Sequence, residues 1–256
     1  MKSGTFFRRI GGVVLALGVA VSATVASAET PVGSTVESRV LMGFQVNPDA
    51  IADWLPEGVV PITLPKGGLA GSNVILALID RHLIMDAEGA PAEPRAGAIA
   101  AFLVYGKSEA GVRGYVTRVY EPAPIQDPYG NSAAGVVDHA VATETAGDAS
   151  QRRERWAVRP DGGGGFNLEL RHVQGALGWS EAGESRPYSS VTPDFFRIYR
   201  YDQLAELVMN AKLGRELNGE VSWQMNIAEL ADVFDGSEEL TAIVSIPVYI
   251  REISLP

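Results

Sequence analysis

The chain has 256 residues, no cysteine and a formal net charge of −10 at pH 7. Hydrophobic residues make up 46% of it and charged residues 20%, which is ordinary for one globular domain of generous size. The acidic balance argues against nucleic acid or an anionic membrane surface as a partner. Nothing repeats at a fixed period, so neither a solenoid nor a propeller is expected.

The N-terminus has the pattern of a secretory signal peptide. Lys2, Arg8 and Arg9 form a basic start, Ile10–Val25 is apolar, and a small-x-small cleavage pattern ends at Ala28. A transmembrane anchor is the alternative, but the apolar run is shorter than the ~20 residues that a spanning helix needs. We therefore expect cleavage after Ala28 and a periplasmic or secreted protein without membrane contact.

Cleavage at this point would leave residues 29–256 as a single domain. It would remove three basic residues and no acidic ones, so that the net charge of the mature chain becomes −13. Because the chain has no cysteine, the exported domain cannot use disulfides and depends on its hydrophobic core. A domain of this length is large enough to bury such a core.

The first expected elements of the domain are a strand and a short helix. Every second residue from Val40 to Val46 is apolar, which predicts a strand over Glu37–Val46. Asn47 is a suitable helix cap and Pro48 suits the first helical position, so a short helix is expected over Ala50–Leu55.

Most of the remaining chain has the pattern of strands separated by polar loops. Helical spacing of Leu204, Leu207, Val208 and Ala211 instead predicts a helix over Gln203–Leu213. A short helical stretch is also expected near Ile227–Phe234, and loops over Arg81–Pro94 and Gly175–Thr192. The further expected strands are Asn73–Asp80, Gly97–Gly106, Gly114–Glu121, Ala140–Thr145, Gln151–Val158, Phe166–Val173, Asp194–Tyr201, Leu217–Asn226 and Thr241–Ile253.

The segment Arg118–Glu144 contains the densest group of reactive side chains. A strand breaks there into a loop with three prolines and two glycines, and a second strand follows. Long irregular connections inside a compact domain are often functional. The reactive side chains of this segment are Tyr129, Asn131, Ser132, Asp138 and His139.

In the order and spacing of its motifs the chain resembles the acetoacetate decarboxylase family. Phe44–Pro56 fits the strand, short helix and Leu-Pro-Glu-like turn of that family, and the loop in Arg118–Glu144 fits its active-site loop. Tyr201–Val208 and Glu220–Trp223 fit two later motifs. The resemblance implies an α+β fold, a mostly antiparallel β-barrel of the acetoacetate decarboxylase-like type with two or three short helices. It also implies an internal pocket for a small oxo-acid.

The Schiff-base lysine of that family has no counterpart in the matching loop. Asp138-His139 stands where the family has its lysine pair, and the Gly-Arg-Glu motif is replaced by Gln126–Ser132. The lysines of the mature chain are Lys66, Lys107 and Lys212, all expected outside this loop. We therefore do not expect Schiff-base decarboxylation.

Three residues of the loop and its second strand are the catalytic candidates: His139, Tyr129 and Asp138. A histidine near the position of the missing lysine could act as a general acid or base. Asp138 and His139 are neighbours on an expected strand, so their side chains should point to opposite faces. A histidine packed or exposed at a strand start is an equally good interpretation of His139.

Arg39, Glu93 and Asn131 are the candidates for substrate binding. Arg39 stands close to the family's carboxylate-binding arginine, and a guanidinium suits bidentate contact with a carboxylate. An outward-facing arginine on a strand is slightly favoured over that role. Glu93 stands near the position of a pocket glutamate, although a surface carboxylate is the better interpretation.

Neither a metal nor a cofactor is indicated. The three histidines are isolated, no His-Glu-x-x-His pattern occurs, and the four consecutive glycines at 162–165 lack the lysine and helix of a phosphate loop. Three functions stay open: an exported lyase-like or hydrolase-like enzyme without the lysine, a non-catalytic periplasmic barrel that binds a small organic acid or an apolar molecule, and a structural envelope protein. The resemblance also leaves a homo-oligomer open.

Overall fold

The computed structural model describes residues 28–123, 125–147 and 149–256. Strands dominate this part of the chain, and the two helices in it are short 3-10 helices, η1 (Pro48–Trp54) and η2 (Ala228–Leu230). The strands are β1 (Thr30–Gln45), β2 (Val60–Pro61), β3 (Val74–Met85), β4 (Gly97–Ser108), β5 (Gly111–Glu121), β6 (Ser132–Ala146), β7 (Ala149–Pro160), β8 (Phe166–Val173), β9 (Gly178–Ser185), β10 (Tyr188–Ser189), β11 (Ile198–Asn210), β12 (Gly219–Met225) and β13 (Glu239–Leu255).

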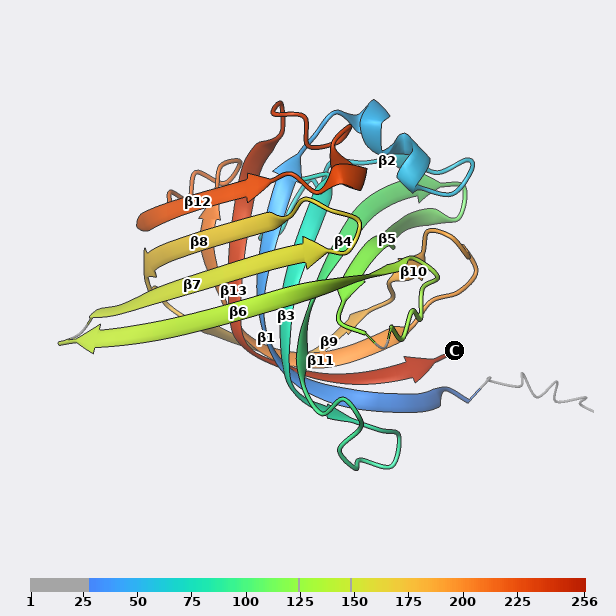
Figure 1. The fold of residues 1–256 in the computed structure, drawn as a ribbon, viewed down its shortest axis with the longest axis horizontal. Helices are drawn as coiled ribbons and strands as arrows, with labels where there is room; N and C mark the ends of the chain where they lie inside the picture. The colour runs from blue at the N-terminus through green and yellow to red at the C-terminus, as the bar shows by residue number, and fades with distance from the viewer. Residues whose placement is uncertain (1–27, 124, 148) are drawn as a thin grey trace, which may run out of the picture.

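The strands form one large sheet in the order β12-β8-β7-β6-β5-β4-β3-β1-β13-β11-β9, with β10 beside β5 and β2 beside β4. All pairings are antiparallel except those of β5 with β6 and with β10. Only three residues of β6 pair with β5, so the sheet turns there into a second layer. Figure 1 shows this layer, β6, β7, β8 and β12, crossing in front of β13, β1 and β3.

The main core lies between the two layers. Alternate residues of β1 point into it, and Val40, Met42 and Phe44 are fully buried there. From the second layer, Trp156 on β7 and Leu168 on β8 belong to the same core. Burial of one such side chain contributes about 1.5–3 kcal/mol, so this face accounts for much of the stability.

The opposite face of the first layer carries the other alternate residues. A second, smaller group of buried apolar side chains includes Ala77 and Ile79 on β3, Ala101 on β4, and Val116 and Val119 on β5. Because neighbouring residues of a strand point to opposite faces, this group is separated from the main core by the sheet itself. The candidate site lies on this second face.

The short helix after the first strand is confirmed in kind and in place. The side chain of Asn47 accepts a hydrogen bond from the backbone of Asp49 at 3.1 Å, and Pro48 begins η1. Both 3-10 helices lie where a short helical stretch was expected.

The expected helix over Gln203–Leu213 is wrong. Residues up to Asn210 belong to β11, which pairs with β13 on one side and β9 on the other. The loop expected over Gly175–Thr192 is also wrong, because this segment contains the strands β9 and β10. Backbone pairing on both edges outweighs the helix propensity of the Leu-Ala-Glu-Leu sequence.

Two features of the expected fold class are also corrected. The described part of the chain is mostly β rather than α+β, since its helices are two short 3-10 turns. The strand order ends at β12 and β9, and no pairing between these two strands closes a barrel in the described residues. The mostly antiparallel sheet itself is confirmed.

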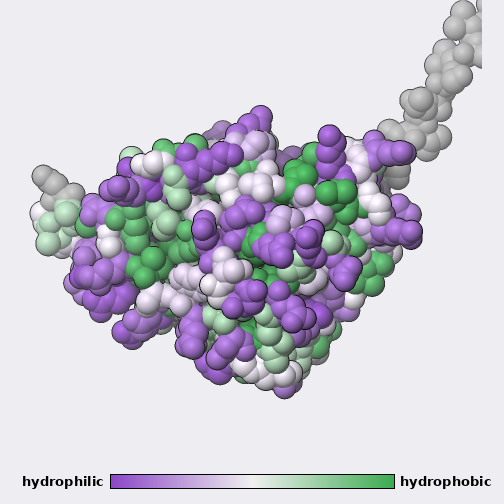
Figure 2. Space-filling model, turned by 90° about the horizontal axis from the view of Figure 1, so that it is seen from above, coloured by the Kyte–Doolittle hydropathy of each residue, from purple (hydrophilic) through white to green (hydrophobic). Residues whose placement is uncertain are grey.

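The predicted signal peptide falls almost wholly on residues 1–27, outside the described residues. In the residues that the structure describes, no helix is both long and apolar enough to cross a membrane. The face shown in Figure 2 carries hydrophilic side chains interspersed with small hydrophobic areas.

Candidate functional site

A cavity of about 1070 Å³ lies against the second face of the first layer. Side chains from β1, β3, β4, β5, β11 and β13 form its walls, together with the loop after β5 and the segment between β9 and β11. Seven basic residues line it, against the two acidic residues Glu121 and Glu184; the basic ones are Arg39, Lys66, Arg81, Arg113, Arg186, Arg197 and Arg251. This excess of positive charge contrasts with the net charge of −10 for the whole chain.

The buried end of the cavity is built around Glu37, whose side chain is inaccessible to solvent. Arg39 donates from Nε to Oε2 of Glu37 at 2.6 Å, and Arg251 donates from Nη2 to Oε1 at 2.7 Å. The hydroxyl of Thr35 also donates to Oε1, at 2.6 Å. Thr35, Glu37 and Arg39 reach the same place because they alternate along β1, and β13 is the neighbouring strand.

The charges at this end hold one another in the ionised state. Burial by itself raises the pKa of the Glu37 carboxyl, but Arg251, Arg39 and the hydrogen bonds outweigh burial and hold the pKa below its usual range. Burial lowers the pKa of Arg251, yet Glu37 and the neighbouring tyrosines together outweigh burial and raise that pKa overall. One carboxylate therefore faces two permanent cations.

Arg81 on β3 and Glu121 at the end of β5 extend this cluster. Both side chains belong to buried residues, with 8% and 5% of their surface exposed. The Nε of Arg81 donates to the carbonyl oxygen of Gly97 at 2.9 Å. Burial lowers the pKa of Arg81, while the charges of Glu121 and Glu37 act against that shift. Together, the guanidinium groups of the buried Arg81 and Arg251 and of the largely buried Arg39 face two buried carboxylates, which leaves one positive charge in excess in this cluster.

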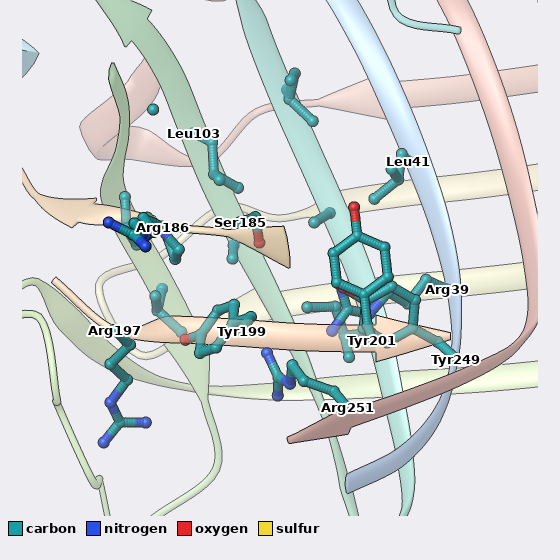
Figure 3. Close-up of a pocket in the computed structure, with 18 of the residues that line it drawn as sticks. Arg39, Leu41, Leu103, Ser185, Arg186, Arg197, Tyr199, Tyr201, Tyr249 and Arg251 are labelled. Carbon is teal, nitrogen blue, oxygen red and sulfur yellow. The ribbon is translucent and has the colours of Figure 1, made fainter. Parts of the chain in front are cut away.

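Six tyrosines line the cavity, and several of them lie against its arginines. The guanidinium of Arg39 lies 3.5 Å from the ring centre of Tyr249, and that of Arg251 lies 4.4 Å from the ring centre of Tyr199. Tyr201 stacks on Tyr249 with ring centres 4.8 Å apart. Figure 3 shows Arg39, Tyr201, Tyr249 and Arg251 gathered at one end of the cavity. Such stacking holds each guanidinium plane in place, and the N–H groups that do not contact Glu37 or Thr35 stay available to a ligand.

The hydroxyl groups of Tyr129 and Tyr199 form a hydrogen bond of 2.5 Å. Burial, together with the neighbouring Tyr199, raises the pKa of Tyr129 far above its ordinary value, so its hydroxyl is neutral at physiological pH. In a pair of neutral phenols, one proton is used within the pair and the other is free to be donated to a ligand. This pair can therefore supply one hydrogen bond to a carbonyl or carboxylate oxygen.

The loop after β5 is fixed in a way that explains the position of Tyr129. Ser189 donates from Oγ to the carbonyl oxygen of Tyr129 at 2.5 Å, and Asn131 donates from Nδ2 to the carbonyl oxygen of Val116 at 2.5 Å. Asp127 and Gly130 both have positive φ, 41° and 74°, which allows the tight turn around Tyr129. Side chains of the loop and of β10 therefore hold the turn around Tyr129 in place.

The comparisons with known proteins concern the fold. The sequence matches no protein-family model and no curated protein. Among solved structures, the enduracididine biosynthesis enzyme MppR in complex with pyruvate matches with a TM-score of 0.56 at 13% identity, over 96% of each chain. An acetoacetate decarboxylase-like enzyme from Sphingomonas wittichii RW1 matches with a TM-score of 0.51 at 10% identity, over 88% of this chain and 91% of its own. The chain has the acetoacetate decarboxylase-like fold.

Within this acetoacetate decarboxylase-like fold, two of the six residues expected at the site line the cavity. They are Arg39 on β1 and Tyr129 in the loop after β5. The outward-facing alternative for Arg39 is excluded by its 11% side-chain exposure and its contact with Glu37.

His139 lies on the other face of the sheet. Its Nδ1 is 2.9 Å from Oδ2 of Asp80, its Nε2 is 3.4 Å from Oε2 of Glu154, and its ring stacks on Trp156 at 3.8 Å. Asp80 alternates on β3 with Ile79 and Arg81, which line the cavity. The histidine is therefore separated from Arg39 and Tyr129 by the thickness of the sheet.

The other three candidates also lie outside the lining of the cavity. Asp138 points away from His139, as expected for strand neighbours, and forms an exposed ion pair with Arg159. Glu93 is exposed and paired with Arg95 at 2.9 Å. Asn131 is buried and serves the loop through the hydrogen bond with Val116, although its Oδ1 has no partner among the described residues.

The candidate site also contains five residues that were not expected there: Glu37, Arg81, Glu121, Tyr199 and Arg251. The signal that could have found three of them is a charged residue at an inward position of an apolar strand. Arg251, for example, alternates with the buried Tyr249 and Ile253 near the end of β13, where the residues between them are exposed. The partner strand of each residue is not readable from the sequence, so the cluster itself was not predictable.

The described residues contain no group of three or more histidine, aspartate or glutamate side chains that could hold a metal ion. Of the lysines, Lys66 lines the cavity, but it is exposed and lies in the segment before β3. Lys107 and Lys212 do not line it.

Proposed function

We propose that the chain is an exported protein that binds a small organic acid in the cavity, with the carboxylate of the ligand at Arg39 and Arg251. The observation that carries this proposal is the charge balance at the buried end. Three guanidinium groups face two carboxylates there, and an uncompensated buried charge is strongly unfavourable. One monoanion would complete the balance.

The chemistry of the surrounding groups also favours a carboxylate with a neighbouring carbonyl. A guanidinium presents parallel N–H groups that match the two oxygens of a carboxylate. The hydroxyl pair of Tyr129 and Tyr199 would donate to a carbonyl oxygen of the same ligand. MppR, which shares the fold, was solved in complex with pyruvate, a 2-oxo-acid, and this supports the choice of an oxo-acid.

A lyase-like enzyme without a lysine is the second candidate, favoured by the free phenolic proton of the tyrosine pair. In decarboxylation of a 3-oxo-acid, the bond to the carboxylate carbon breaks and CO₂ leaves. The electron pair of the broken bond forms an enolate, which then takes a proton. A hydrogen bond from Tyr199 or Tyr129 to the enolate oxygen would lower the barrier. Arginines that hold the carboxylate stabilise the bound substrate, because decarboxylation removes this charged group as CO₂. Binding without turnover is therefore the better supported function. His139 and Asp138 take no part in either proposal.

Calorimetry of the mature protein with 2-oxobutanoate and with its neutral analogue butanone tests the proposal. The acid should bind and the ketone should not. Arg39→Gln and Arg251→Gln should each weaken binding about ten- to a hundredfold, as loss of a charge-assisted hydrogen bond implies. Arg200→Gln is the matched control, because Arg200 lies on β11 between Tyr199 and Tyr201 but pairs with Glu29 outside the cavity. Equal binding of ketone and acid, or binding of neither, would refute the proposal.

Turnover and export need separate measurements. Incubation with 3-oxobutanoate, followed by NMR, should show no faster loss of CO₂ than in buffer; faster loss that disappears in Tyr199→Phe would establish the lyase instead. Export is supported by the basic start and the cleavage pattern at Ala28. Mass spectrometry of the protein from the producing cell should find a mature chain that begins at Glu29.

A further inference from the structure

An apolar wall begins directly beside the charged end of the cavity. Leu41, Ala77, Ala101 and Val119 are neighbours across β1, β3, β4 and β5, and all four line the cavity. The next row farther from the charges is also wholly aliphatic and consists of Ile75, Leu103 and Val116. In Figure 3, Leu41 and Leu103 both lie above the labelled tyrosines and arginines, on separate strands.

The register of the strands gives the length of this wall. Ile79 is the partner of Arg39, and Ile75 is four residues farther along β3. At about 3.3 Å per residue the wall extends roughly 13 Å beyond the guanidinium of Arg39. A three- or four-carbon acid held at the arginines would contact only the part of this wall nearest to them.

The middle of the wall is hollowed by two small residues. Ala77 and Ala101 are direct partners on neighbouring strands, and larger aliphatic side chains surround them. Each of these alanines is less than a tenth exposed, so side chains around the cavity already screen them from open solvent. Their small side chains leave room for a ligand above the middle of the wall.

We infer that the ligand is an amphipathic monocarboxylate, with its acid group at Arg39 and Arg251 and an unbranched apolar chain of several carbons along the wall. This inference rests on the proposed function and adds the class of ligand. The charged cluster at the buried end has room in its charge balance for one carboxylate, and the two aliphatic rows beside it have no polar side chain to satisfy a second polar group. Each added methylene that leaves water should tighten binding about three- to fourfold.

A series of straight-chain 2-oxo-acids from pyruvate to 2-oxodecanoate tests the inference by calorimetry. Affinity should rise with chain length, by about a hundredfold or more between three and eight carbons. Affinity that is flat or highest for pyruvate would overturn the inference while the proposed function stands. Binding of no acid in the series would overturn both.

Variants of the wall locate the chain of the ligand. Ala101→Leu should remove most of the gain with chain length, so that acids of four to eight carbons bind with similar affinity. Ala142→Leu, the same change at an exposed strand position on β6, should leave the gain with chain length unchanged. If thermal unfolding shows that Ala101→Leu is not folded, Ala77→Val is the milder alternative. An unchanged preference for long chains in a folded wall variant would overturn the inference.

Discussion

Arg251 on the last strand donates a hydrogen bond to Glu37 on the first strand at 2.7 Å, across a sequence separation of 214 residues. Arg39, only two residues from Glu37, approaches the same carboxylate from the other side. The first and last strands thus contribute to one charged cluster, because β1 and β13 pair along most of their length. The cluster connects the stability of the sheet with the charge of the cavity.

Replacement of Glu37 by glutamine should destabilise the protein by about 3–5 kcal/mol, since it leaves Arg39 and Arg251 buried without their counter-charge. Denaturant unfolding at pH 7 measures this loss. A bound organic acid should recover part of it in the variant, because the acid supplies the missing negative charge. A loss below about 1 kcal/mol would mean that water already solvates these arginines.

The same variant has a predicted dependence on pH. The pKa of Glu37 is lowered in the folded state, so its contribution to stability is present above its ordinary pKa, near 4.5, and is lost as pH falls through the lower folded value. The difference between wild type and Glu37→Gln should therefore shrink below pH 4.5. A difference in stability that grows as the pH falls would contradict the assignment of an ionised carboxylate to Glu37.

Tyr199→Phe should distinguish the carbonyl group of the ligand from its carboxylate. The variant loses one hydroxyl of the pair with Tyr129 and keeps the ring against Arg251. Affinity for a 2-oxo-acid should fall about three- to tenfold, whereas affinity for the saturated acid of equal length should hardly change. Calorimetry with both acids measures the two effects, and an equal loss for both would place the hydroxyl pair at the carboxylate.

Reduction with borohydride in the presence of an oxo-acid should leave the mass of the protein unchanged. A Schiff base needs an unprotonated amine, and a desolvated lysine is the usual way to obtain one near neutral pH. Lys66 is the lysine that lines the cavity, and it is exposed. Intact-mass spectrometry is the measurement, with Lys66→Arg as the control. An adduct that disappears in this variant would return lysine chemistry to the cavity.

Sequence patterns predicted most of the strands; alternation along β8, for example, directly reflects one buried and one open face. They failed at β11, where good helix formers are held in the sheet by pairing with β13 and β9. At the site, Arg39 and Tyr129 were found through motifs, whereas Arg251 and Glu37 meet only through strand pairing. His139 shows the converse: its place in the motif gave no information about which face of the sheet it occupies.

The buried contacts of His139 predict a role in stability. Burial by itself lowers its pKa, but the contacts with Glu154 and Asp80 outweigh burial and raise the pKa above the ordinary value of 6.5. A group with a raised folded pKa contributes stability that is fully present below the unfolded pKa and is lost as pH rises through the folded value. His139→Phe, which keeps an aromatic ring against Trp156, should therefore destabilise the protein more at pH 5.5 than at pH 9.

Denaturant unfolding at both pH values, together with ligand calorimetry, tests this role. The same replacement at His82, whose side chain is 48% exposed, controls for the loss of a histidine. Binding of the organic acid by His139→Phe should stay within about twofold of wild type at pH 7, because the sheet separates this residue from the cavity. If binding were lost while the pH dependence of stability stayed unchanged, His139 would act on the ligand and its assignment to the core network would be wrong.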